Sequence, residues 1–139
     1  MESFNQLNSQ LVNENVYAIL PDKGGNLLLG TLSALVSFNP EKKSFTTIDK
    51  EKDGTPFTSQ RITILFRDSR KRLWIGGEEG ISVFQQEGIE IEKAPILPES
   101  SVTKTFTNCI YEASNGIIWI GTREGVYCFN EEEKTIKRY

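Results

Sequence analysis

The chain contains no histidine and only two cysteines, Cys109 and Cys128, among its 139 residues. Without histidine it can assemble neither a Ser-His-Asp nor a Cys-His catalytic centre, and it cannot form a histidine-ligated zinc or iron site. The cysteines do not form a CxxC motif, which argues against a metal or redox pair. We therefore predict a protein that uses no metal and no other cofactor.

Long apolar runs and an excess of basic residues are also missing. No apolar stretch comes near the length of about 20 residues that a membrane helix needs. We therefore expect no membrane segment in this chain. The first residues, MESFN, lack the basic start and apolar stretch of a secretory signal. The net charge is −3, and the basic residues are dispersed among acidic ones. This pattern excludes the basic patch expected of a nucleic-acid-binding protein.

A motif that recurs three times is the strongest positive feature. The segments GNLLLG, RLWIGG and IIWIGT carry aligned glycines at Gly30, Gly76 and Gly121, which are 46 and 45 residues apart. A repeat of this length, made of alternating apolar runs and turn residues, is typical of β-propeller blades. We predict an all-β propeller fragment of three four-stranded antiparallel blades. Because closed propellers have about four to eight blades, other blades should complete the ring.

Each repeat contains the turn expected between the first two strands of a blade. The predicted first strands, residues 16–22, 62–68 and 107–113, lead into turns that begin at Asp22, Asp68 and Ala113. An aspartate there can accept hydrogen bonds from backbone N–H groups of the turn, and a glycine three residues later tolerates a positive φ. The second turn has Lys71 in place of that glycine, and the third has Ala113 in place of the aspartate. We expect those two turns to be individually weaker.

The repeat also predicts how the chain divides. Aligned phenylalanines mark the third strands, and the fourth strands are the most polar, as expected at a rim. The loops between blades are rich in proline, serine, threonine and charged residues. We predict the outer strand of a preceding blade with its connecting loop at 1–14, blades at 15–49, 61–93 and 106–139, and loops at 50–60 and 94–105.

The cysteines and tryptophans fit structural positions. Cys109 and Cys128 fall on the first and third strands of the third blade, which are nearly 10 Å apart and beyond disulfide reach of about 7 Å. We therefore expect two free, buried thiols. Trp74 and Trp119 occupy the same place in successive repeats, and Leu28 takes that place in the first. This recurrence favours packing between blades over stacking on a sugar ring.

Carboxylate pairs are the remaining catalytic candidates. Glu78 and Glu79 lie in a connection between second and third strands, and Glu124 follows Arg123 in the equivalent connection. A glycosidase would need two carboxyl groups about 5–9.5 Å apart across a sugar-binding cleft, whereas adjacent acids in a turn are commonly just solvated. We predict that the chain is not an enzyme.

The segments WIGGEEGISVF and WIGTREGVYCF, each preceded by a turn in the pattern D-x-x-G-x-x-W or close to it, resemble the two-component regulator propeller repeat. In that family such repeats form the extracytoplasmic sensor of hybrid two-component systems of Bacteroides-like bacteria. A membrane helix, a histidine kinase and a response regulator follow the propellers there. The resemblance implies a periplasmic location, a parent protein anchored in the inner membrane, and a role in sensing oligosaccharides.

Two hypotheses follow from these observations. The first is a noncatalytic sensor fragment that contacts an oligosaccharide through loops at one end of the propeller. The second is a structural module whose exposed end blades associate with another copy, giving a six-bladed ring from two chains, or with the remaining blades of the parent. The candidate ligand-binding residues are Asn13, Asn15, Gln60, Arg61, Glu78, Glu79, Lys104, Arg123 and Glu124.

Overall fold

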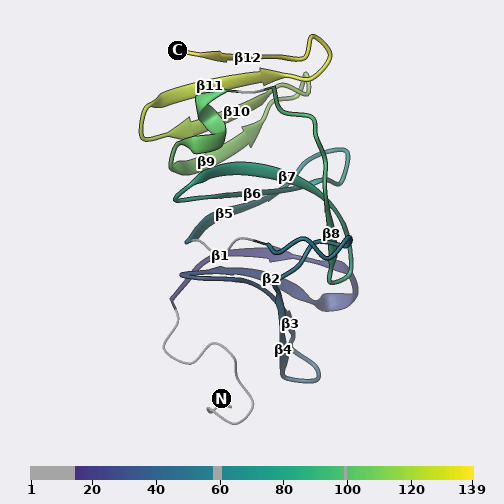
Figure 1. The fold of residues 1–139 in the computed structure, drawn as a ribbon. Helices are drawn as coiled ribbons and strands as arrows, with labels where there is room; N and C mark the ends of the chain where they lie inside the picture. The colour runs from purple at the N-terminus through teal and green to yellow at the C-terminus, as the bar shows by residue number, and fades with distance from the viewer. Residues whose placement is uncertain (1–14, 58–60, 99) are drawn as a thin grey trace.

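The structure is a computed structural model that describes residues 15–57, 61–98 and 100–139. It is an all-β fold with three four-stranded antiparallel sheets, which confirms the predicted fold class. The sheets are stacked in chain order, with the first at the bottom of Figure 1 and the third at the top. The predicted strand at 1–14 lies outside the described residues.

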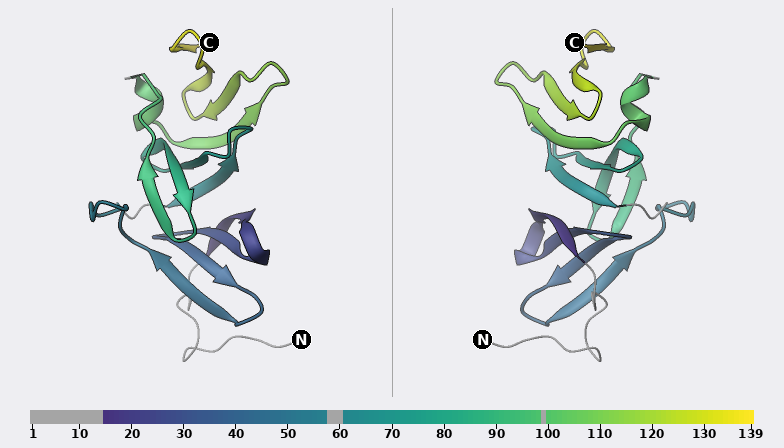
Figure 2. Two further views of the ribbon diagram at one scale, coloured as in Figure 1. Left: turned by 90° about the vertical axis from the view of Figure 1, so that its right-hand side faces the viewer. Right: turned by 90° about the vertical axis from the view of Figure 1, so that its left-hand side faces the viewer.

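Each sheet is one blade, with its strands ordered as they occur along the chain. We call the sheets blade one (β1–β4), blade two (β5–β8) and blade three (β9–β12). The two views of Figure 2 show the blades from their sides. The strands are β1 (Val16–Pro21), β2 (Leu27–Thr31), β3 (Leu35–Asn39), β4 (Ser44–Ile48), β5 (Ile62–Arg67), β6 (Leu73–Gly77), β7 (Gly80–Glu87), β8 (Glu90–Lys93), β9 (Thr107–Glu112), β10 (Ile118–Thr122), β11 (Gly125–Asn130) and β12 (Thr135–Arg138).

The pairing register confirms that the three motifs occupy equivalent places. Leu28, Trp74 and Trp119 each pair with the next-to-last residue of the first strand of their blade. The first two strands of each blade also shift register near the start of the first strand, which is the mark of a β-bulge. In blade two the Thr63 hydroxyl, at this bulge, donates to the Thr107 carbonyl at 2.6 Å. The bulge therefore ties the inner strands of neighbouring blades together.

The hydrophobic core lies between blades rather than within one. One cluster joins Leu28 and Leu35 of blade one to Ile62 and Leu73 of blade two. A second joins Trp74 of blade two to residues of blade three that include Phe129. A four-stranded sheet is a single layer, so its apolar side chains are shielded from water only when another layer covers them. Blade two contributes to both clusters.

The glycine that defines the repeat allows blades to approach closely. A Cβ atom added at Gly30 would lie 2.5 Å from Ile62 Cγ2, and one added at Gly76 would lie 2.8 Å from Thr107 Cγ2. Both of these neighbours belong to the following blade. The recurring glycine thus leaves the room that the next blade's first strand needs.

The prediction that both thiols are buried is wrong. Cys109 is exposed and Cys128 is half-buried, although both are free. Because side chains alternate along a strand, the buried Ile118, Ile120 and Phe129 face blade two, and the cysteines lie on the opposite face. In the part of the chain that the structure describes, no blade covers that face.

Candidate functional site

Residues that carry charge collect at two opposite ends of the strands. The loop end contains the starts of the first strands and the turns between second and third strands. There the amides of Glu78 and Arg123 donate to the carbonyls of Arg61 and Phe106, at 3.1 and 3.2 Å. The turn end contains the turns between first and second strands and those between third and fourth strands. The predicted binding residues that the structure describes lie at the loop end.

At the loop end of blade two, Arg61 and Glu78 form an ion pair. Arg61 Nη2 donates to Glu78 Oε2 at 3.1 Å, and the Arg61 guanidinium lies 5.9 Å from the centre of the Tyr17 ring of blade one. Asn15 Nδ2 donates to the Tyr17 hydroxyl at 3.5 Å. The structure therefore groups Asn15, Arg61 and Glu78 around Tyr17, and Glu79 is exposed beside them.

At the loop end of blade three, Arg123 and Glu124 contact the two residues that precede β9. The Arg123 guanidinium lies 4.0 Å from the centre of the Phe106 ring, a cation–π contact. The Thr105 hydroxyl donates to Glu124 Oε2 at 3.2 Å. Lys104 is exposed at the end of the 3₁₀ helix η2 (Ser101–Lys104). Asn13 and Gln60 lie outside the described residues.

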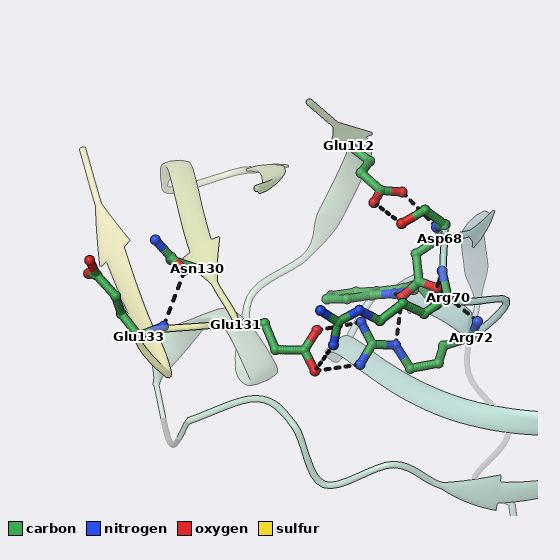
Figure 3. A network of polar contacts seen from close by, with 9 residues as sticks. Asp68, Arg70, Arg72, Glu112, Asn130, Glu131 and Glu133 are labelled. Atoms are coloured by element: carbon green, nitrogen blue, oxygen red, sulfur yellow. Dashed lines mark hydrogen bonds and ion pairs between the residues drawn. The ribbon is translucent and has the colours of Figure 1, made fainter. Parts of the chain in front are cut away.

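The turn end holds a polar network that joins blades two and three (Figure 3). Asp68, which is 4% exposed, directly follows β5, the first strand of blade two. Its carboxylate accepts hydrogen bonds from the backbone amides of Arg70 and Arg72 at 2.9 and 2.8 Å, from Arg72 Nε at 2.7 Å and from Trp74 Nε1 at 2.8 Å. The predicted role of this aspartate in its turn is confirmed, and the side-chain bonds extend that role into the core.

Arg72 carries the network across to blade three. Its Nη1 and Nη2 atoms donate to the two carboxylate oxygens of Glu131, both at 2.7 Å. This paired geometry is among the strongest that arginine makes with a carboxylate. The hydrogen bonds from Arg72 hold the pKa of Glu131 below its usual value, and those to Glu131 raise the pKa of Arg72. The pair is therefore charged on both sides.

Three further contacts complete this joint between the blades. Arg70 Nη1 lies 3.2 Å from Glu131 Oε2. The Ser69 amide and hydroxyl both donate to the Glu112 carboxylate, at 2.8 and 2.6 Å. Blade two thus supplies the donors, and blade three supplies two acidic acceptors.

In the equivalent joint between blades one and two, the donor and acceptor roles are reversed, because blade one supplies the acceptor and blade two supplies the donors. Asp22 Oδ2 accepts from Gln86 Nε2 at 3.0 Å, and Asp22 Oδ1 lies 3.5 Å from Arg67 Nη2. By register, Arg67 takes the place of Glu112, and Gln86 takes the place of Glu131. The expected hydrogen bonds from the turn amides to the Asp22 side chain are not formed. That prediction is wrong because this carboxylate turns towards the next blade.

Each joint borders a cleft at the turn end. The cleft between blades one and two has a volume of about 470 Å³ and is lined by residues that include Asp22, Arg67 and Lys71. The cleft between blades two and three has a volume of about 300 Å³ and is lined by residues that include Arg72, Glu112 and Glu131. These clefts lie at the end opposite the predicted residues.

Sequence reasoning missed the turn-end residues because it searched the loops for polar side chains. Arg67, Arg72, Glu112 and Glu131 lie at strand ends and tight turns. The sequence did contain a signal for these residues, because equivalent positions of successive repeats carry different charges. A comparison of Arg67 with Glu112, and of Gln86 with Glu131, would have pointed to the joints.

The pKa direction at Glu131 predicts a pH dependence. A carboxyl group whose pKa is lower in the folded state stabilises the fold above its unfolded pKa, near 4.5, and loses that contribution as the pH falls through the lowered folded pKa. We expect the free energy of unfolding to decrease as the pH falls below about 4.5, and we expect Glu131→Gln to make this decrease shallower. Urea unfolding measured at several pH values tests the prediction.

Glu133→Gln is the matched control, because Glu133 lies in the same turn and is exposed. Its backbone amide bonds to Asn130, whereas no bond of its carboxylate is found among the described residues. A pH profile that flattens equally in both variants would contradict the assignment to Glu131.

Among the residues that the structure describes, no group of three or more histidine, cysteine, aspartate or glutamate residues could hold a metal ion. No helix there is long and apolar enough to cross a membrane.

Comparison with known proteins identifies the repeat. The family model for the two-component regulator propeller matches residues 56–79 and 100–124. Histidine kinase P4 from Formosa agariphila is 29% identical over 93 residues, which are 66% of this chain and 7% of that protein. The chain therefore spans a small part of that relative.

Solved structures share the fold. The extracellular domain of a B. thetaiotaomicron protein named as a hybrid two-component system superposes with a TM-score of 0.69 and 21% identity, over 100% of this chain and 18% of that one. Virginiamycin B lyase from Staphylococcus aureus gives a TM-score of 0.62 and 17% identity, over 95% of this chain and 43% of the lyase. At these identities the likeness shows the fold alone. Together with the family match, it shows a β-propeller fold in which residues 56–79 and 100–124 match the two-component regulator propeller repeat.

Proposed function

We propose that this chain is a noncatalytic part of the extracytoplasmic sensor domain of a hybrid two-component signalling protein, where it contributes to oligosaccharide sensing and signal transduction. The observation that supports this most directly is that each segment matched by the family model contains the first two strands of one blade. Residues 56–79 include β5, the Asp68 turn and β6, and residues 100–124 include β9 and β10. The names of the kinase relative and of the extracellular domain support the same assignment.

The charged side chains already form hydrogen bonds and ion pairs within the protein, which supports a noncatalytic role. A propeller can host catalysis, as the name of the lyase indicates. Whether a propeller is catalytic therefore depends on the residues of its site and not on its fold. In this chain, Arg72 donates to Asp68 of its own blade and to Glu131 across the blade joint. Arg61 bonds to Glu78, and Glu124 accepts from Thr105. These carboxylates stabilise the fold, which leaves them poorly suited to acid–base work.

The proposal also includes a cellular location. The B. thetaiotaomicron neighbour is described as an extracellular domain. We place the chain in the periplasm, as part of a parent protein anchored in the inner membrane. A fusion of the parent's sensor region to a reporter enzyme that is active only in the periplasm tests this, and a fusion that is produced at full length but shows no reporter activity would contradict it.

A titration by NMR tests ligand binding directly. The ¹⁵N-labelled chain is mixed with neutral and acidic oligosaccharides, and amide shifts are followed at the loop end, around Arg61 and Arg123, and at the turn end. Saturable shifts confined to one end would support the proposal and locate the contact. A parent sensor that responds to an oligosaccharide equally well after these three blades are exchanged for other blades of the same family would contradict it.

A structural role is the second candidate, and exposed apolar side chains favour it. On the outer face of blade three, Tyr111 is 64% exposed, Tyr139 is 69% exposed and Val126 is exposed beside them. Blade two shows how such a face is normally covered, because its equivalent residues pack under blade three. Large exposed apolar faces commonly mark protein contacts. We propose that this face packs against another blade, either of the parent protein or of a second copy.

Light scattering coupled to size exclusion, over a series of concentrations, tests the second candidate. A particle of twice 15.7 kDa would indicate two copies joined in a six-bladed ring. A monomer at every concentration would exclude association with a second copy.

A further inference from the structure

The cleft between blades one and two is distinguished by its cations. Lys23, Arg67 and Lys71 line it, together with the acids Asp22 and Glu87. Lys23 lies 3.9 Å from Glu87, and both side chains are almost fully exposed, so this pair is weak. Asp22 lies deep, with its side chain 11% exposed. The lining thus carries three cations and two acids, and Arg67 and Lys71 are the two cations that are not paired with Glu87.

Arg67 and Lys71 both have side-chain N–H donors that make no contact among the described residues. The Arg67 side chain makes one polar contact in the described part of the chain, at 3.5 Å to Asp22, which is at the limit of a hydrogen bond. Lys71 bonds through its backbone amide to the Asp68 carbonyl, and no partner for its ammonium group is found among the described residues. A guanidinium presents several N–H donors in a planar fork that matches a carboxylate or a sulfate.

The cleft between blades two and three contains the Arg72–Glu131 ion pair, which has no equivalent in the cleft between blades one and two. Arg72 fills the space between blades two and three and binds the carboxylate of Glu131 through both terminal nitrogens. In the cleft between blades one and two, the residue equivalent to Arg72 is Asn26, and the residue equivalent to Glu131 is Gln86. The shorter side chain and the neutral amide leave a larger cleft, about 470 Å³ against about 300 Å³, with cations and no facing acid of the Glu131 kind.

We propose that the cleft between blades one and two binds an acidic group, a carboxylate or a sulfate, carried by an oligosaccharide. The inference rests on the proposed sensor function and adds the ligand class and a location away from the loop end. Arg67 and Lys71 supply the charge-assisted hydrogen bonds, and Asp22 lies 3.5 Å from the Arg67 guanidinium. The volume of about 470 Å³ suits one or two sugar rings.

Lys71→Gly is a clean test because it removes the charge without disturbing the turn. Lys71 has φ 66°, and the equivalent positions of the other two turns are Gly25 and Gly116, at φ 81° and 85°. Glycine adopts this conformation without strain. Lys134→Gly is the matched control, since Lys134 has φ 54° in a turn of blade three and does not line this cleft.

The experiment is calorimetric and NMR titration of the whole chain with trigalacturonate, with a sulfated disaccharide and with neutral maltotriose. We expect an acidic sugar to bind, binding to weaken with added salt, and Lys71→Gly to reduce affinity by about tenfold, while Lys134→Gly leaves affinity unchanged. Arg67→Gln, which can still contact Asp22, should have a similar effect to Lys71→Gly. Comparison of the two acidic probes distinguishes carboxylate from sulfate recognition.

Three results would overturn the inference. One is acidic-sugar binding that is unchanged in Lys71→Gly, and another is equal loss in both lysine variants. The third is the absence of any binding of the acidic sugars. If maltotriose alone binds, the acidic-cleft inference fails while the sensor proposal stands. If a parent sensor no longer needs these blades for its response, the sensor proposal fails separately.

Discussion

Asp68→Ala should lower the free energy of unfolding by about 3–5 kcal/mol. The side chain is buried and accepts four hydrogen bonds, two of them from the side chains of Arg72 and Trp74. Its loss leaves a buried guanidinium with one carboxylate partner instead of two and leaves a buried indole N–H without an acceptor. Unsatisfied buried groups of this kind carry the full cost of desolvation. Chemical denaturation monitored by tryptophan fluorescence measures the change.

Asp22→Ala is the matched control, because Asp22 begins the equivalent turn of blade one. Its carboxylate makes two cross-blade contacts, at 3.0 and 3.5 Å, and none to its own turn amides. We expect a loss of about 1 kcal/mol there. Equal losses at the two positions would show that the number of buried acceptor bonds does not determine the cost. A double-mutant cycle between Asp68 and Arg72 then isolates the energy that couples these two residues.

Trp74→Ala should cost about 3–5 kcal/mol, the usual range for removing a buried aromatic side chain. Trp74 is 0% exposed, and its ring centre lies 6.0 Å from that of Phe129 in the next blade. The substitution would open a cavity between two blades and remove the hydrogen bond to Asp68. A shift in the denaturation midpoint, with an unchanged dependence on denaturant, would show that stability changed without a change in the denatured state.

Trp119 provides an internal comparison at the same repeat position. Its ring is half-buried and its centre lies 6.0 Å from that of Tyr139 in its own blade. We expect Trp119→Ala to cost about 1 kcal/mol, because a solvent-exposed face loses little on truncation. A cost equal to that of Trp74→Ala would mean that Trp119 is also covered in solution. Such a result would favour the structural proposal, in which another blade packs on blade three.

The features that the sequence predicted correctly are local patterns and their recurrence. Strand alternation and turn residues are local and specify a blade, and their recurrence every 45–46 residues specifies three blades. Lys71 shows how firm this encoding is, since it adopts φ 66° in the place where its two equivalents are glycine. The bonds predicted from the turn amides to Asp68 are formed, while the expectation that Lys71 makes this turn weaker stays a prediction.

The features that sequence reasoning missed depend on partners in another blade. Arg72 and Glu131 are 59 residues apart, and neither stands out in its own turn. Asp22 has the same repeat position as Asp68, yet it bonds to Gln86 because the residue two positions before Leu28 is Asn26 instead of an arginine. The exposure of Cys109 likewise depends on which blade covers the third sheet. Local patterns do not contain this information.

The sharing of both core clusters by blade two has a consequence for cooperativity. In a linear stack, each layer is stabilised only by the layers beside it, so unfolding can begin at a terminal layer and advance as a front. Removal of blade three would uncover Trp74 and Val83, whereas loss of blade two would uncover apolar side chains on both sides. The amides of β6 and β7 should therefore exchange with solvent more slowly than those of β11 and β12, and their exchange should report the global unfolding of all three blades.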